Sequence, residues 1–184
     1  MGKDYSSISD EHREWIAEQS MFFVATAPLA ADGHVNLSPK GFDTFRILDA
    51  NRVAYLDLTG SGAETIAHLR ENGRVTIMFM ALSGRPRILR LYGTGTAHLH
   101  GTDRFDELAA GFAPHQVARS VIDVSVERVR SSCGYTVPLL EPVGMRDTYD
   151  NWADRRGPTI DEYWATRNST SIDGLPAIDS ENPA

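Results

Sequence analysis

The stretch VAYLDLTGSGAETIAHLRENGRVTIMFMALSGRPRILRLYGTG, residues Val53 to Gly95, decides the fold. Val53 to Leu58 is apolar and β-prone, and the small residues that follow end this predicted strand. From Ala63 to Glu71 apolar residues recur at helical spacing, which predicts a short helix with one buried face. Gly73 comes directly after it and suits the positive φ of a helix C-terminal cap.

Two more strands complete this stretch. Arg74 to Leu82 is a nearly continuous apolar run, so we expect both of its faces to be covered. Ser83 to Pro86 forms a turn, and Arg87 to His100 is long enough for a strand bulged at Gly93 or Gly95.

A loop of small residues, Thr59 to Gly62, precedes the predicted helix. Free N–H groups and the positive end of the helix dipole meet at such a position, and both favour a phosphate. The alternative is a simple cap, because Ser and Thr are common at helix starts without any ligand.

Outside this stretch the pattern predicts more strands than helices. Ser9 caps a helix that begins at Asp10, and Met21 to Ala27 is a strand. A second strand returns in a hairpin, and Pro39 should end its pairing. We expect further strands at 42–48 and 121–129, a helix capped by Thr102, and two helices within 147–168. About seven strands in short succession indicate a closed or partly closed β-barrel with peripheral helices.

Several segments carry a family resemblance. The residues LDLTGSGAETIAHLRENGRVTIMF followed by RILRLYGTG resemble the pyridoxamine 5′-phosphate oxidase-like family of split β-barrel flavoproteins. The upstream VNLSPKGF resembles the strand after the first hairpin of that family, and CGYTVPLL and SIDGLP are similar to the tail of one branch. The resemblance covers about residues 5 to 180. It implies one mainly β, FMN-binding-like split-barrel domain over residues 1–184, with a core at about 20–131 and a helical C-terminal extension at about 134–184.

Composition excludes several functions. The 184 residues are 41% hydrophobic and carry a net charge of −7, which argues against binding nucleic acid or an anionic membrane. No apolar run has the length of a membrane span, and the polar N-terminus does not resemble a secretory signal. The single cysteine, Cys133, cannot form an intrachain disulfide, so we expect a cytoplasmic protein.

Ser38 and Lys40 are the first candidate site residues. The resemblance implies that a basic residue near this strand contacts FMN, where a positive charge stabilises the reduced anionic ring. The alternative is a turn with a solvated lysine.

The phosphate end of the candidate site departs from the family pattern. Glu64 and Thr65 stand where the resemblance implies an Arg-Lys pair, and a carboxylate facing a phosphate is repulsive. Either Glu64 turns away and the phosphate relies on backbone N–H groups and other side chains, or FMN is not the ligand. The predicted cofactor-binding residues are therefore Ser38, Lys40, Ser61, Gly62, Thr65, Arg87 and Arg90. The two arginines are the replacement donors, but they would lie on opposite strand faces, so only one can face a given site. For both arginines the alternative is a charge on the barrel surface.

Other chemical motifs are weak. His98 and His100 would share one strand face, but without a visible third ligand we predict no metal site. Cys133 is interpreted as a structural residue, because Arg130 is the only cationic neighbour that could activate it. No catalytic residue can be named.

The resemblance predicts an FMN-binding oxidoreductase of unknown small-molecule substrate. It implies a homodimer that holds the cofactor between its two chains, with the C-terminal Trp152 and Trp164 as candidates to wrap the partner. A deazaflavin-dependent reductase and a non-catalytic flavin or haem carrier are the alternatives; the acidic chain disfavours the first. Pyridoxamine phosphate oxidation is disfavoured, because arginines for the substrate phosphate are not recognisable near the C-terminus.

Overall fold

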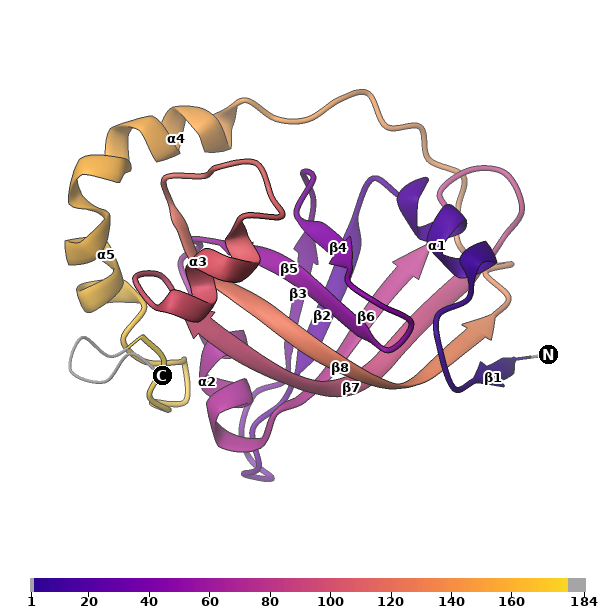
Figure 1. Ribbon diagram of the computed structural model, residues 1–184, viewed down its shortest axis with the longest axis horizontal. Coiled ribbons are helices and arrows are strands. Elements are labelled where there is room, and N and C mark those ends of the chain that lie inside the picture. Colours follow the sequence, from indigo (N-terminus) through magenta and orange to yellow (C-terminus); the bar gives the residue numbers. More distant parts are fainter. Residues whose placement is uncertain (1, 179–184) are drawn as a thin grey trace.

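Eight antiparallel strands form one sheet that curls into a half-barrel (Figure 1). The computed structural model describes residues 2–178. The sheet order is β3-β2-β6-β7-β8-β5-β4, and β1 pairs with the far end of β8. The strands are β1 Lys3–Tyr5, β2 Phe22–Thr26, β3 Asn36–Lys40, β4 Phe45–Ile47, β5 Arg52–Leu58, β6 Arg74–Met80, β7 Ile88–Leu99 and β8 Ala118–Ser132. The split-barrel fold is confirmed.

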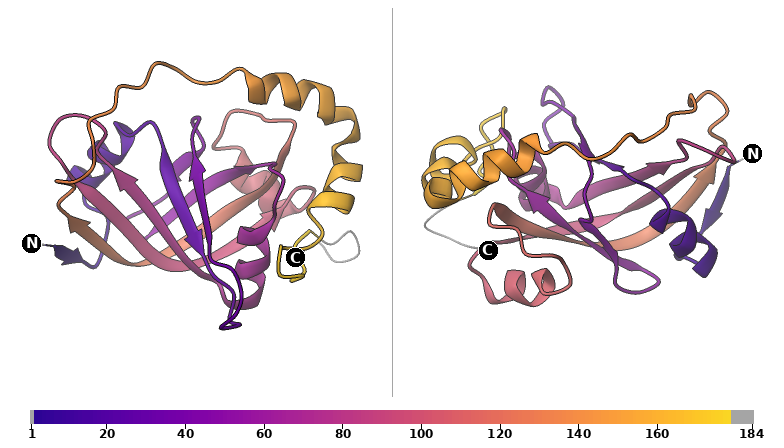
Figure 2. Two further views of the ribbon diagram at one scale, coloured as in Figure 1. Left: turned by 180° about the vertical axis from the view of Figure 1, so that it is seen from behind. Right: turned by 90° about the horizontal axis from the view of Figure 1, so that it is seen from above.

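Five α-helices surround the sheet, as Figures 1 and 2 show. They are α1 Asp10–Ala17, α2 Glu64–Asn72, α3 Asp103–Ala109, α4 Thr148–Arg156 and α5 Ile160–Arg167. Ser9 and Thr102 accept a backbone N–H of the first turn of α1 and α3, as predicted, and Gly73 ends α2 at a φ of 71°. Local capping rules therefore locate these helix ends correctly.

The concave face of the sheet holds the main core. Val24, Tyr55, Ile77, Leu89 and Ile122 are fully buried there, each on a different strand. A smaller apolar cluster lies on the other face, where α3 packs its Phe105 against β5 and β8. The half-barrel is thus filled by side chains rather than hollow.

The predicted bulge lies at Gly93, where the register between β7 and β8 shifts. A Cβ atom on Gly93 would lie only 2.0 Å from the carbonyl oxygen of Ser125. Only glycine permits this close backbone approach.

Two strand predictions were wrong, and one strand was not predicted. Burial alternates along β6, so its outer face is only partly covered and the apolar run does not mark a strand buried on both faces. Pro39 lies inside β3 instead of ending its pairing, because an edge strand needs no N–H on its outer side. The sequence analysis also missed β1, a strand of three residues with no apolar pattern.

The open seam of the half-barrel lies between its two edges, β3 on one side and β4 and β5 on the other. Aromatic rings bridge it in the core: the ring centroid of Phe22 lies 5.2 Å from that of Phe45 and 5.6 Å from that of Tyr55. The seam positions the candidate site described below.

The C-terminal extension packs on its own chain. After β8 the chain runs outside the half-barrel from the α1 end to α4 at the opposite end (Figure 1). Trp164 is buried with Val117 and Ile160, and Trp152 packs at the edge of the same cluster. Trp164 is thus covered by its own chain and donates to Thr59 at the start of the β5–α2 loop. That Trp152 and Trp164 wrap a partner stays a prediction.

The last described residues dock as well. Ala177 is fully buried, and Arg70 of α2 donates a hydrogen bond to its carbonyl oxygen. The acidic sequence of residues 173–184, poor in large apolar side chains, predicts disorder unless it docks. The chain packs on the barrel as far as Ile178, and the rest of that prediction lies outside the described residues. Among residues 2–178 no helix is long and apolar enough to cross a membrane.

Candidate functional site

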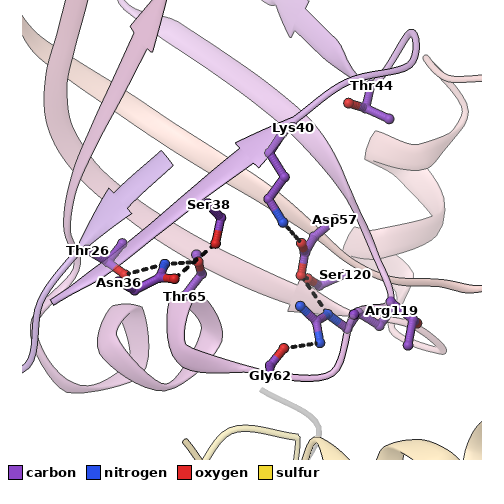
Figure 3. A network of polar contacts seen from close by, with 12 residues as sticks. Thr26, Asn36, Ser38, Lys40, Thr44, Asp57, Gly62, Thr65, Arg119 and Ser120 are labelled. Atoms are coloured by element: carbon purple, nitrogen blue, oxygen red, sulfur yellow. Dashed lines mark hydrogen bonds and ion pairs between the residues drawn. The ribbon is translucent and has the colours of Figure 1, made fainter. Parts of the chain in front are cut away.

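A buried carboxylate, Asp57, is the centre of the candidate site (Figure 3). It lies on the inner face near the end of β5 and is fully buried. Lys40 Nζ lies 2.8 Å from one carboxylate oxygen, and Arg119 Nε lies 2.7 Å from the other. The side chain of Arg119 is only 5% exposed, whereas that of Lys40 is 19% exposed and reaches solvent.

These contacts keep Asp57 ionised. Burial alone would raise the pKa of its carboxyl, but Arg119 and Lys40 outweigh this effect and hold the pKa well below its usual range. Two cations thus share one anion, which leaves one unit of positive charge in excess. Such a cluster favours a further anionic group nearby.

A row of neutral polar groups continues along the inner face of β3 (Figure 3). Ser38 donates to Asn36, and the Asn36 amide donates to Thr26 at 3.2 Å and to Thr65 at 3.0 Å. Thr26 also shares a 2.9 Å hydrogen bond with His68, whose pKa is lowered by burial. This row fixes the side chains of β3 next to Lys40.

The C-terminal extension fixes the loop between β5 and α2. The fully buried Asn168 donates to the carbonyl oxygens of Gly60 and Ser61, and its own oxygen accepts from Arg119 at 3.0 Å. Arg119 also donates to the Gly62 carbonyl at 2.7 Å. Asp57, the loop and the extension are therefore one connected network.

A second anchor holds the start of this loop. Trp164 donates to the Thr59 hydroxyl at 2.8 Å, and Tyr149 donates to the Thr59 carbonyl at 3.0 Å. Burial raises the pKa of Tyr149, so it stays a hydrogen-bond donor over the whole physiological range. Both aromatic residues come from the extension.

The N-terminus of α2 has no side-chain cap, because Ala63 occupies the cap position. Glu64 folds back over Gly62, and its carboxylate accepts the backbone N–H of Ile172 at 3.3 Å. Thr65 is buried and bound to Asn36. Of the two residues at the positions of the expected basic pair, one thus points to the tail and the other into the barrel.

The predicted site residues fall into three groups. Ser38, Lys40 and Thr65 lie together on the inner side of the seam. Ser61 and Gly62 lie in the loop that Arg119 and Asn168 hold from behind. The two arginines of the β7 region make up the third group.

The structure does not bring Arg87 and Arg90 to either of the first two groups. Arg87 pairs with Glu11 at 2.8 Å and lies over the ring of Trp15 near α1. Arg90 is on the outer face of β7, opposite to the inward-facing Leu89, and donates to Ser132. Because Lys40 is on the inner face, Arg90 and Lys40 lie on opposite sides of the sheet.

Sequence reasoning missed Arg119 and Asn168. One signal pointed to the network: Asp57 is the only charged residue within the apolar run Val53–Leu58, and a buried carboxylate requires cationic partners. Nothing local to Arg119 or Asn168 identifies them as those partners.

Two weaker candidates also have a place in the structure. In the described residues no group of three metal-binding side chains occurs, and His98 lies 3.8 Å from Asp123. Cys133 is free and exposed, so its prediction as a structural residue is not supported by burial.

Comparison with known proteins places this geometry in a family. A family model described as pyridoxamine 5′-phosphate oxidase matches residues 8–133, more than half of the chain. The chain belongs to the pyridoxamine 5′-phosphate oxidase family. A member of this family from Aspergillus flavus, the protein ustO, is 38% identical over 195 residues, which cover 96% of this chain and 78% of that protein.

Solved structures agree with the family fold. The protein HupZ from Group A Streptococcus is 26% identical, with a TM-score of 0.52 over 66% of this chain and 91% of that one. A protein from Lactobacillus delbrueckii gives a TM-score of 0.52 at 17% identity over 68% of this chain and 94% of that one. The shared region is the split barrel, and the extension that builds the network around Asn168 lies largely beyond the residues matched by the family model.

Proposed function

We propose that this member of the pyridoxamine 5′-phosphate oxidase family binds FMN and serves as a flavin-dependent oxidoreductase for a small molecule. The observation that carries the proposal is the excess positive charge at Lys40 and Arg119, which share the single carboxylate of Asp57. An anionic ring system is the natural ligand for such a charge next to hydroxyl and amide groups.

The residues present fit the ring of FMN better than they fit its phosphate at the start of α2. Lys40 offers a cation that reaches solvent, and Ser38 and Asn36 lie on the same face of β3. At α2 itself Glu64 lies over Gly62, which disfavours an anion at that point. The phosphate therefore needs cations from another part of the chain.

When bound, FMN would supply the group that accepts and donates electrons. The protein's own residues would orient it and set its polarity. Lys40 would hold positive charge near the ring, and Asp57 would fix the position of the Lys40 ammonium through the 2.8 Å ion pair. Arg119 would keep the loop at Ser61 in place through its bond to Gly62.

We also propose that the active form is a homodimer located in the cytoplasm. An apolar surface supports the dimer: Tyr135, Leu139 and Val143, in the segment between β8 and α4, have side chains that are largely or fully exposed. Several apolar side chains exposed in one segment are unusual on a monomer and are typical of an interface. A second copy of this chain is the partner that we propose.

The experiment is a ligand titration of the purified protein. An absorbance scan detects co-purified flavin, and equilibrium titrations then compare FMN, a deazaflavin coenzyme and haemin on one preparation. We expect FMN to bind, and then to be reduced by NADH or NADPH and reoxidised on adding an acceptor. Absence of binding to FMN would overturn the proposal. Preferential binding of the deazaflavin or haemin would assign the site to that cofactor, and FMN binding without turnover would indicate a carrier.

A further inference from the structure

A pocket of about 380 Å³ lies between the β5–α2 loop and the C-terminal extension. Ser61 lines one side of it, and residues from the end of α4, the short 3₁₀ helix Gly157–Thr159 and α5 line the other. They are Arg156, Thr159, Glu162, Tyr163, Thr166 and Arg167. We call this the Ser61 pocket. It joins the loop that the sequence predicts as a phosphate site to a part of the chain about 100 residues further on.

Two arginines give the Ser61 pocket its charge. Arg156 ends α4 and lies 5.8 Å from the ring centroid of Tyr163, and Arg167 ends α5. Within residues 2–178 neither arginine forms an ion pair. Among the described residues Glu162 is the only carboxylate of the lining, so these side chains carry one net positive charge. The hydroxyls of Thr159 and Thr166 already donate to helix carbonyls, whereas those of Ser61 and Tyr163 line the pocket as further polar groups.

The carboxylate of Glu64 lies over the neighbouring Gly62, outside the lining of the Ser61 pocket. Glu64 is not part of the lining, because its side chain reaches back to the N–H of Ile172. The loop backbone is held from behind by Asn168 and Arg119, so Ser61 is fixed at the pocket without using its own hydroxyl.

We propose that Arg156 and Arg167, together with Ser61, bind the terminal phosphate of a phosphorylated ligand. This inference rests on the proposed function, in which that ligand is FMN, and it assigns the phosphate to the C-terminal extension. The two arginines then supply the positive charge that Glu64 and Thr65 cannot supply. Guanidinium groups are well suited to this role because they donate paired hydrogen bonds to phosphate oxygens.

The test compares FMN with riboflavin, which has the same ring and lacks the phosphate. We expect the Arg156→Ala/Arg167→Ala variant to bind FMN at least tenfold more weakly than the parent protein and to bind riboflavin equally well. The matched control is Arg155→Ala, which removes an exposed arginine one residue away that lines a different depression. It should leave both affinities unchanged.

A change of opposite sign completes the test. Glu162→Gln removes the carboxylate that lines the pocket and should strengthen FMN binding a few-fold, again without an effect on riboflavin. If the double arginine variant lost affinity equally for FMN and riboflavin, or lost none, the assignment of the phosphate to the two arginines would be overturned. The proposed function would still stand as long as the parent protein binds FMN. If the parent protein bound neither flavin, the proposed function would fail, and this inference with it.

Discussion

Lys40 and Asp57 meet across the open seam of the half-barrel, with the Lys40 ammonium nitrogen 2.8 Å from a carboxylate oxygen of Asp57. Lys40 ends β3, one edge of the sheet, and Asp57 lies on β5 beside the other edge. The ion pair thus connects two strands that no backbone ladder joins, and it places the positive charge of the candidate site at that junction.

Replacing Asp57 with Asn should destabilise the fold strongly. The change leaves Lys40 and the buried Arg119 without a counter-charge, which typically costs about 3–5 kcal/mol. Urea unfolding followed by circular dichroism measures the loss. Asp43→Asn is the control, because Asp43 pairs with Arg46 in solvent and should matter by less than about 1 kcal/mol. Similar losses in both variants would contradict a special role for Asp57.

The lowered pKa of Asp57 should make the stability of the fold depend on pH. The pKa of Asp57 is lower in the folded chain than its ordinary value of 3.8. The contribution of Asp57 to the free energy of unfolding is therefore complete above pH 3.8. It is lost as the pH falls from that value through the lower pKa of the folded chain, where the carboxylate takes up a proton. Unfolding measured between pH 7 and pH 2.5 should show a steep loss below pH about 4. The Asp57→Asn variant should show a shallower one, and an identical slope would refute this assignment.

Asn168→Ala should loosen the loop at Ser61. The change removes two donated hydrogen bonds to loop carbonyls and the acceptor of Arg119, so we expect a loss of about 1–3 kcal/mol. Hydrogen exchange should increase at residues 60–63 before it increases elsewhere. Asn151→Ala, on the exposed side of α4, is the control, since its side chain bonds only within its own helix turn.

A pH-sensitive contact joins the β2–β3 hairpin to the tail. His34 and Asp173 form a 2.6 Å ion pair, and their hydrogen bond raises the pKa of His34 above its usual value of 6.5. The stabilisation from this pair is therefore complete below pH 6.5, where His34 is charged. It is lost as the pH rises through the raised pKa of His34 in the folded chain. An NMR titration should show the raised pKa of His34 and its return to the ordinary range in Asp173→Asn. An unchanged titration in that variant would rule out the pair in solution.

The proposed dimer predicts which apolar residues matter. Leu139→Ser combined with Val143→Ser should shift the protein toward monomer in analytical ultracentrifugation, because both side chains are exposed in the single chain. Leu29→Ser is the control, since Leu29 is also exposed but lies in the β2–β3 hairpin, where its backbone N–H donates to Glu71 of α2. A parent protein that sediments as a monomer would exclude the proposed dimer.

The sequence predicted the elements that local rules govern. Ser9 and Thr102 cap helices, Gly73 ends one, and Gly93 marks the bulge, because each of these outcomes depends on a few neighbouring residues. The strand predictions failed at Pro39, where the outcome depends on strand order. Whether a proline is tolerated is decided by which strand forms the edge, and the local pattern does not contain that information.

The candidate site was only partly predictable for the same reason. Ser38, Lys40 and Thr65 could be predicted as site residues because the motif around each of them resembles a known family. Arg119 and Asn168 join them through pairings of distant segments, and the replacement cations expected at Arg87 and Arg90 lie elsewhere. Arg156 and Arg167 approach Ser61 only because the extension folds back on its own barrel.

Pro39 limits how two copies of this chain can associate. It lies on β3, at the free edge of the sheet, where a neighbouring molecule would otherwise find a continuous row of backbone donors. A missing N–H in a five-residue edge strand interrupts that row. Growth of the sheet from one molecule into the next is therefore disfavoured at this edge.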